Sequence, residues 1–70
     1  MTILIKLKNG DKLSIKNLSS IKSWDSRNAN LIETKDFSTF TIFNKNYIFV
    51  GDNTLTINGS EILYVEFQNP

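Results

Sequence analysis

The chain has 70 residues with eight Lys or Arg against seven Asp or Glu, so its formal net charge is only +1. It contains neither cysteine nor histidine, which excludes disulfide bonds and removes the most common metal ligand and general base. No apolar run approaches the roughly 20 residues of a membrane-spanning helix and no secretory signal pattern is present, so we expect a single cytoplasmic domain, residues 1–70, that does not bind membranes.

Residues 2–8 and 12–16 predict two strands joined by a turn at Asn9-Gly10, because apolar and polar side chains alternate on both sides of that dipeptide. A two-residue loop would place apolar side chains opposite polar ones. A three-residue loop over 8–10, with Gly10 left-handed in a bulged turn, pairs apolar residues with one another: Ile3 with Ile15 and Ile5 with Leu13. A one-residue slip would turn every side chain to the other face, so we predict the bulged turn.

This register gathers lysines on the outward face of the hairpin, where Lys6 falls opposite Lys12. The predicted face contains Lys6, Lys8, Lys12 and Lys16, completed by Leu4 and Ser14. Like charges placed directly opposite are mildly destabilising. The pattern therefore suggests a face for an anion or an acidic partner, and the alternative is a solvated face that protects the hairpin edge from aggregation.

Residues 17–30 show no clear strand pattern. Three apolar residues recur at a spacing of three: Leu18, Ile21 and Trp24. This spacing suits one short helical turn near residues 19–25, and an irregular continuation of the preceding strand is the alternative. Ser26, Asn28 and Asn30 indicate a loop. Trp24 and Arg27 are candidate anchors of a protein interface; the alternative is that Trp24, with Leu18 and Ile21, closes one end of the core.

The second half of the chain predicts further short strands over residues 31–34, 39–43, 47–50, 54–57 and 62–67. Turns are expected at 51–53 and 58–60. A loop over 44–46, with Asn46 left-handed, pairs residues on one inward face: Phe40 with Val50 and Ile42 with Ile48. The last strand is apolar on both faces apart from Glu66, so it should be central or an edge covered by another copy.

That pairing would leave three aromatic side chains on the opposite face: Phe43, Tyr47 and Phe49. An exposed apolar patch of this kind marks a contact surface. These residues are therefore candidates for a protein interface, either with a partner or between copies.

Together the strand and turn signals predict an all-β fold: a small barrel or a compact two-layer antiparallel sheet of about five to seven short strands. The single alanine agrees with this expectation, because the best helix former is nearly absent.

No pattern in the chain points to catalysis. Seven serines have no histidine to activate them, and Asp52 and Glu61 belong to predicted turns, where carboxylates are usually solvated. No phosphate-binding loop or dinucleotide fingerprint is present. We expect no enzyme, no metal and no cofactor.

The charge distribution is uneven. Residues 1–30 carry six cations against two anions, a net +4, whereas residues 31–70 carry two cations against five anions, a net −3. Such asymmetry between halves suggests an interaction face or self-complementarity between copies.

Two end segments, residues 5–15 (IKLKNGDKLSI) and 58–67 (NGSEILYVEF), resemble the ends of short accessory proteins carried by phages and prophages of A/T-rich bacteria. The resemblance is one of style and transfers no functional residue. It implies a non-enzymatic binder in the bacterial host cytoplasm, including inhibitors of host defence enzymes such as nucleases.

The leading hypothesis is therefore a protein-binding module that acts on a larger host protein and forms a homo-oligomer, most simply a dimer. One alternative is a small nucleic-acid-binding domain that uses the lysine face, although the aromatic residues gather from Phe37 onward and do not interleave with those lysines. The other alternative is a structural component of a phage assembly.

Overall fold

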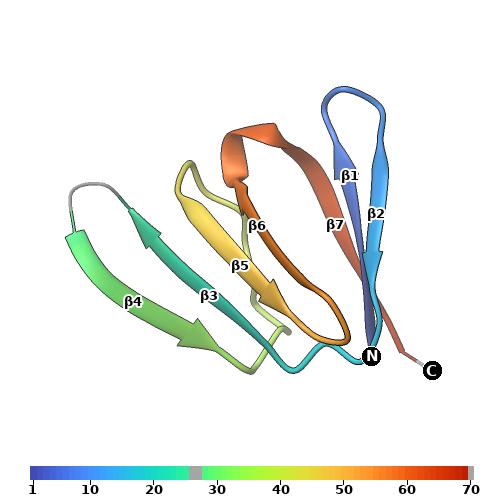
Figure 1. Ribbon diagram of the computed structural model, residues 1–70, viewed down its shortest axis with the longest axis horizontal. Coiled ribbons are helices and arrows are strands. Elements are labelled where there is room, and N and C mark those ends of the chain that lie inside the picture. Colours follow the sequence, from blue (N-terminus) through green and yellow to red (C-terminus); the bar gives the residue numbers. More distant parts are fainter. Residues whose placement is uncertain (26–27, 70) are drawn as a thin grey trace.

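The computed structural model describes residues 1–25 and 28–69, without the side chains of residues 28 and 29. Its strands are β1 (Thr2–Leu7), β2 (Lys12–Ile15), β3 (Ser20–Asp25), β4 (Asn28–Thr34), β5 (Asn46–Val50), β6 (Thr54–Asn58) and β7 (Ile62–Gln68). One 3₁₀ turn, η1 (Gly59–Glu61), joins β6 to β7. The strands form two antiparallel sheets, ordered β2-β1-β7 and β4-β3-β5-β6 (Figure 1). The predicted all-β fold is confirmed, with two sheets and strands at the upper end of the expected number.

The two sheets share one hydrophobic core. Its fully buried side chains are Ile3 and Ile5 from β1, Ile21 from β3, and Tyr47 and Phe49 from β5. They belong to a single cluster of packed residues. In β1 and β5 every second residue faces this cluster, so the intervening side chains of these two strands face outward.

The N-terminal hairpin has the predicted register. Ile3 lies opposite Ile15, and Ile5 lies opposite Leu13. The Gly10 N–H donates to the Leu7 carbonyl at 3.0 Å, the Leu7 N–H donates to the Asp11 carbonyl at 2.8 Å, and Gly10 has φ of 100°. This is the bulged three-residue turn that the apolar pattern requires.

Residues 19–25 contain no helical turn, so that prediction is wrong. Residues 20–25 form β3, which pairs with β4 on one side and β5 on the other. Pairing along both edges satisfies the β3 backbone, and the small buried side chains of Ser20 and Ser23 fit the packed interior. The loop expected at Asn28 and Asn30 is also wrong, because both residues belong to β4; Ser26 is outside the described residues.

Residues 39–43 form no strand, contrary to prediction. The physical reason is that both edges of β5 are already occupied, by β3 and β6. The predicted pairs Phe40 with Val50 and Ile42 with Ile48 therefore do not form. Residues 35–45 instead connect β4 to β5, pass behind β5 and β6 in Figure 1, and pack three side chains on the core: Phe37, Phe40 and Ile42.

Asn46 is not left-handed, since it is the first residue of β5. The described non-glycine residue with a positive φ is Asn17, at 54°. Its side-chain amide lies 3.2 Å from both carboxylate oxygens of Asp52. The left-handed turn that the sequence suggests at one asparagine thus occurs at another, between β2 and β3.

The turn over residues 51–53 and the strand that follows it are confirmed by the β5–β6 hairpin, in which Val50 lies opposite Thr54. The turn expected over 58–60 coincides with the start of η1. The last strand is β7, which pairs with β1 and forms an edge of its sheet. The central position considered for it is therefore wrong.

Candidate interaction surfaces

Trp24 lies on the outward side of the four-stranded sheet. The inner side is formed by buried residues that pair across β3 and β5: Ile21 with Phe49 and Ser23 with Tyr47. Because side chains alternate along a strand, Trp24 and Ile48 face the other way. Lys22 lies opposite Ile48, and Trp24 lies opposite Asn46, so Trp24 and Ile48 are diagonal neighbours. Trp24 therefore does not close an end of the core.

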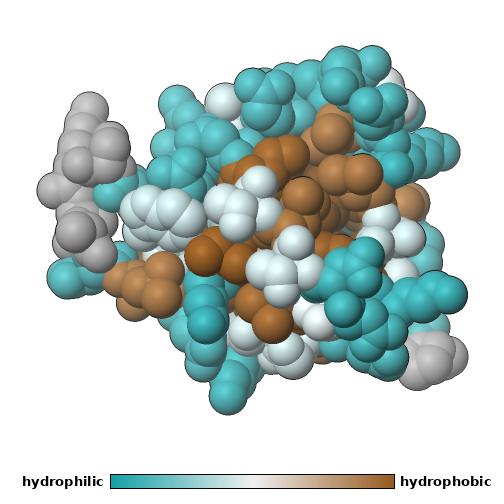
Figure 2. Space-filling model, viewed as in Figure 1, coloured by the Kyte–Doolittle hydropathy of each residue, from teal (hydrophilic) through white to brown (hydrophobic). Residues whose placement is uncertain are grey.

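We call this outward surface the Trp24 face; it comprises Lys22, Trp24, Asn46, Ile48 and Val50. Its three apolar members are all partly exposed. In Figure 2, viewed from the side opposite segment 35–45, the largest apolar area lies over β6 and β7, and smaller apolar areas lie over β5 and β4. An apolar centre within a polar rim is the usual composition of a protein contact surface.

The three aromatic residues predicted to form one exposed interface, Phe43, Tyr47 and Phe49, do not lie on one surface. Tyr47 and Phe49 are fully buried, 1% and 0% exposed, so the prediction that they face outward is wrong. The pairing of β5 with β3 rather than with residues 39–43 moves the inner face by one residue. Phe43 is 62% exposed and lies in the segment before β5. Arg27, the remaining predicted interface residue, is outside the described residues.

Phe43 and Tyr47 are nevertheless connected by a hydrogen bond. The backbone N–H of Phe43 donates to the Tyr47 hydroxyl oxygen at 2.7 Å. Burial raises the pKa of the Tyr47 hydroxyl, and the hydrogen bond from Phe43 partly opposes that shift. The amine of Lys45 lies about 6 Å from both rings, within cation–π range. This contact fixes the exposed Phe43 segment to the core.

The lysine face forms around a pair of lysines on neighbouring strands. Lys6 lies opposite Lys12, as predicted, and the Lys6 amine donates to the Gly10 carbonyl at 2.9 Å. On the other side of β1, Tyr64 of β7 lies opposite Lys6. An aromatic side chain, 44% exposed, therefore stands beside the lysine pair. No local sequence pattern indicates this neighbour, because β1 and β7 are far apart in the chain.

The other two predicted lysines lie toward the ends of this face. Lys8, in the turn, borders a hollow of about 380 Å³ together with Phe43 and Leu63. Lys16 follows β2 and lies beside Asp52, whose N–H donates to the Lys16 carbonyl at 2.9 Å. The four lysines thus form a central pair and two flanking positions rather than one cluster.

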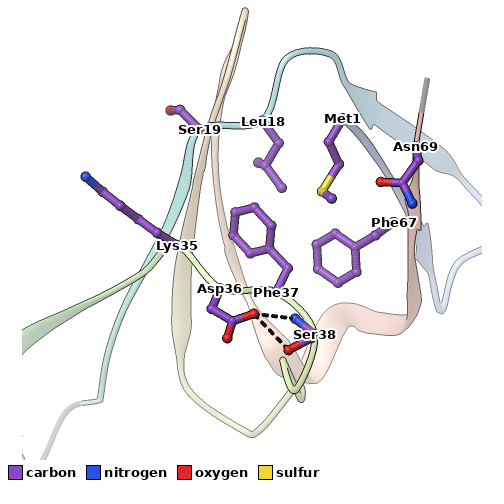
Figure 3. A pocket seen from close by; sticks show the side chains of 9 residues that line it. All are labelled: Met1, Leu18, Ser19, Lys35, Asp36, Phe37, Ser38, Phe67 and Asn69. Carbon is purple, nitrogen blue, oxygen red and sulfur yellow. Dashed lines mark hydrogen bonds between the residues drawn. The ribbon is translucent and has the colours of Figure 1, made fainter.

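A cleft of about 710 Å³ was not anticipated from the sequence. Its lining residues are Met1, Leu18, Ser19, Lys35, Asp36, Phe37, Ser38, Phe67 and Asn69 (Figure 3). The rings of Phe37 and Phe67 stack at 5.3 Å between centroids, with Leu18 and Met1 directed into the same space. Only the path of segment 35–45 brings Phe37 to β7, and no local sequence pattern indicates this contact.

The edge of this cleft carries a fixed negative charge. The carboxylate of Asp36 accepts hydrogen bonds from the Ser38 hydroxyl at 2.8 Å and the Ser38 N–H at 3.1 Å. These two hydrogen bonds lower the pKa of Asp36. Asp36 is therefore ionised across the physiological range.

Among residues 1–25 and 28–69, no three acidic, histidine or cysteine side chains gather as a metal site would require. No helix in the same residues is long and apolar enough to cross a membrane. Comparisons of the chain with protein-family models, with curated proteins and with solved structures found no match.

Proposed function

We propose that the protein is a non-enzymatic protein-binding module that docks on a larger partner through the Trp24 face. The observation that carries this proposal is the outward position of Trp24 beside Ile48, on a sheet whose opposite side already holds the core. Tryptophan is the residue type most often found as an energetic anchor in protein interfaces.

The polar surround of the Trp24 face supports a protein rather than a nucleic-acid partner. Asn46 and Asn58 lie side by side next to Trp24, and the Asn58 amide donates to the Asn46 side-chain oxygen at 3.0 Å. Lys22 is the cation of the face, and Glu33 lies opposite it on β4. A nearly neutral surface of this kind offers little attraction to phosphates.

The biological role that we propose is based on the resemblance of residues 5–15 and 58–67 to short phage and prophage accessory proteins. In that setting the module is a phage or prophage accessory protein, acts in the host cytoplasm, and inhibits or modulates a host protein such as a defence nuclease. It forms a homodimer while doing so. A structural component of a phage assembly would differ by forming large particles, which sedimentation distinguishes from a small discrete complex.

Trp24 also provides the experiment, because it is the only tryptophan in the chain. A partner retained from host lysate is purified and titrated against the protein. We expect the Trp24 emission to shift to shorter wavelength and acrylamide quenching to fall as the ring is covered. Unchanged emission and quenching in the saturated complex would exclude the Trp24 face as the contact.

Two variants complete this test. Trp24→Ser should lose the partner, whereas Lys12→Ser, on the other sheet, should retain it. Far-ultraviolet circular dichroism of both variants checks that the fold is intact. Equal partner affinity of the two variants would contradict the proposed face.

The second candidate function is nucleic-acid binding on the lysine face, favoured by the position of Tyr64 beside Lys6. Single-strand binders combine cations that follow the backbone with aromatic rings on which bases stack. Replacing Lys6, Lys8, Lys12 and Lys16 by Ser should abolish retention of single-stranded DNA or RNA, and Tyr64→Ala should weaken it. Absence of retention by the parent protein at low salt would reject this function.

A further inference from the structure

The cleft of about 710 Å³ between segment 35–45 and the end of β7 has an aromatic wall. Phe37 and Phe67 lie nearly parallel, with 8° between the ring planes and 5.3 Å between the centroids. Phe40 stands perpendicular to Phe67, at 88° and 5.9 Å, so a third ring supports the wall. Both Phe37 and Phe67 are only partly buried. Contacts within the chain therefore fix the wall, and part of it is open to solvent.

Aliphatic side chains face this wall across the cleft. Figure 3 shows Leu18 and Met1 extending toward the two rings. Leu18 belongs to the core cluster, whereas Met1 is exposed. The unbranched thioether of methionine packs well on aromatic rings. The space between the rings and these two side chains suits a flat apolar group, and its volume is within the range of sites for small organic molecules, about 300 to 1,000 Å³.

The charge at the rim of the cleft is negative. One oxygen of the Asp36 carboxylate accepts both hydrogen bonds from Ser38, and the other accepts none from any described residue. Lys35 is the one cationic side chain that borders the cleft. Its amine lies 3.7 Å from the Glu33 carboxylate, and Figure 3 shows it pointing away from the cleft. Because the faces of aromatic rings are also partly negative, the cleft favours a cation over an anion.

We propose that this cleft binds a small organic cation that carries an aromatic ring. The ring lies between the Phe37–Phe67 pair and Leu18, and the cationic group lies at the rim beside the Asp36 carboxylate. A cation within about 6 Å of the Phe37 ring is attracted by its negative face as well. The site is independent of the proposed function, since none of its lining residues belongs to the Trp24 face.

Two features favour a small molecule over a docked protein. A stable protein interface buries about 800 Å² on each partner, whereas four side chains form the apolar part of the cleft. A few polar groups surround this apolar lining, as is typical of small-molecule sites. Figure 3 shows two of them at opposite sides of the cleft, the Asp36 carboxylate and the Asn69 amide. The amide can orient a polar substituent of a ligand whose cationic group lies at Asp36.

Three probes of similar shape and different charge test the proposal: naphthylmethylammonium, naphthylmethanol and naphthoate. Each is titrated into isotope-labelled protein and followed by NMR. The cation should shift the amide signals of Phe37 and Phe67 and give nuclear Overhauser contacts from its ring to the Leu18 methyl groups. The alcohol should bind about two- to fivefold more weakly, the range expected for an exposed charge pair. Naphthoate should bind more weakly still.

Two variants and a matched control identify the groups responsible. Asp36→Asn should remove the preference for the cation over the alcohol and leave the affinity for the alcohol unchanged. Asp11→Asn makes the same change of charge in the N-terminal hairpin and should keep the preference. Phe37→Leu should weaken binding of the cation and the alcohol by about three- to tenfold. Asp36 is exposed, so Asp36→Asn tests the site even if Phe37→Leu disturbs the fold.

Equal binding of the three probes would indicate an apolar site without charge selection and would overturn the proposal, as would tighter binding of naphthoate. Absence of binding at millimolar concentration, or signal shifts confined to other parts of the chain, overturns it as well. If the Phe37 and Leu18 signals shift with protein concentration alone, a second copy covers the cleft and the proposed ligand is wrong. Equal loss of preference in Asp11→Asn and Asp36→Asn would contradict the role of Asp36.

Discussion

The hydroxyl oxygen of Tyr47 accepts a hydrogen bond from the backbone N–H of Phe43 at 2.7 Å, and that contact ties segment 35–45 to the core. In Tyr47→Phe the Phe43 N–H loses its partner in a partly buried position. We expect a loss of about 1 to 2 kcal/mol in the free energy of unfolding. Urea denaturation of the variant and parent measures it; equal stability would mean that water replaces the hydroxyl without cost.

The same residue predicts a dependence of stability on pH. Burial raises the pKa of Tyr47 above its ordinary value of 10.0, so the neutral hydroxyl is favoured in the folded state. The resulting stabilisation is fully present below pH 10.0 and is lost as pH rises through the higher folded pKa. Urea midpoints measured from neutral to strongly alkaline pH should fall less steeply for Tyr47→Phe than for the parent. Parallel curves would contradict this assignment.

Gly59 allows close packing between η1 and the segment before β5. A Cβ at this position would overlap the Phe43 carbonyl oxygen and lie 3.0 Å from the Tyr47 ring. Gly59→Ala should therefore destabilise the protein by more than about 2 kcal/mol, since a backbone atom must move. The control is Gly10→Ala, where a Cβ meets open space and only the φ of 100° is strained; its cost should be about 1 kcal/mol. Thermal unfolding compares the stability of the two variants. A Gly10→Ala variant less stable than Gly59→Ala would be inconsistent with this packing.

Trp24 and Phe49 belong to the same sheet but to opposite sides of it. Phe49→Ala removes a fully buried ring and should cost about 3 to 5 kcal/mol. Trp24→Ala removes a ring from the outward face and should cost under about 1 kcal/mol. Chemical denaturation followed by circular dichroism compares them. A large loss for Trp24→Ala would place its ring against the core rather than in a docking surface.

The hydrogen bonds of Ser38 predict how Asp36 titrates. Because they lower the pKa of Asp36, any stabilisation they contribute is present above its ordinary value of 3.8 and is lost as pH falls through the lower folded value. Ser38→Ala removes the hydroxyl donor and should move the pKa of Asp36 back toward 3.8. NMR titration of the carboxyl carbon reports the shift directly. Thr39→Ala, at the next residue, should leave that pKa unchanged.

The features that sequence patterns predicted well are local ones. The bulged turn at Gly10 and the pairing of Lys6 with Lys12 follow from residues within one hairpin, where the apolar pattern determines the register. The turn over residues 51–53 is correct for the same reason. The all-β fold class needs only the frequency of such strands and turns.

The errors concern which distant strands become neighbours. Tyr47 and Phe49 lie on the face opposite to the predicted one, because β3 pairs with β5 in place of residues 39–43, which are nearer in sequence. β3 itself resembled a helical turn because its apolar residues fall three apart. The position of Tyr64 beside Lys6 and the stacking of Phe37 on Phe67 likewise depend on long-range pairing that no local pattern encodes.

The pairing of β1 with β7 has a consequence for how the chain folds. β1 is synthesised first, yet one of its two partners is the last strand of the fold. Bringing β1 and β7 together closes a loop of most of the chain, and the entropic cost of closing it precedes any stabilising contact. Proteins dominated by contacts between residues distant in sequence fold in milliseconds to seconds. During synthesis one edge of β1 therefore remains unpaired until β7 has been made. The lysines of the N-terminal hairpin hinder its association with other nascent chains during that time.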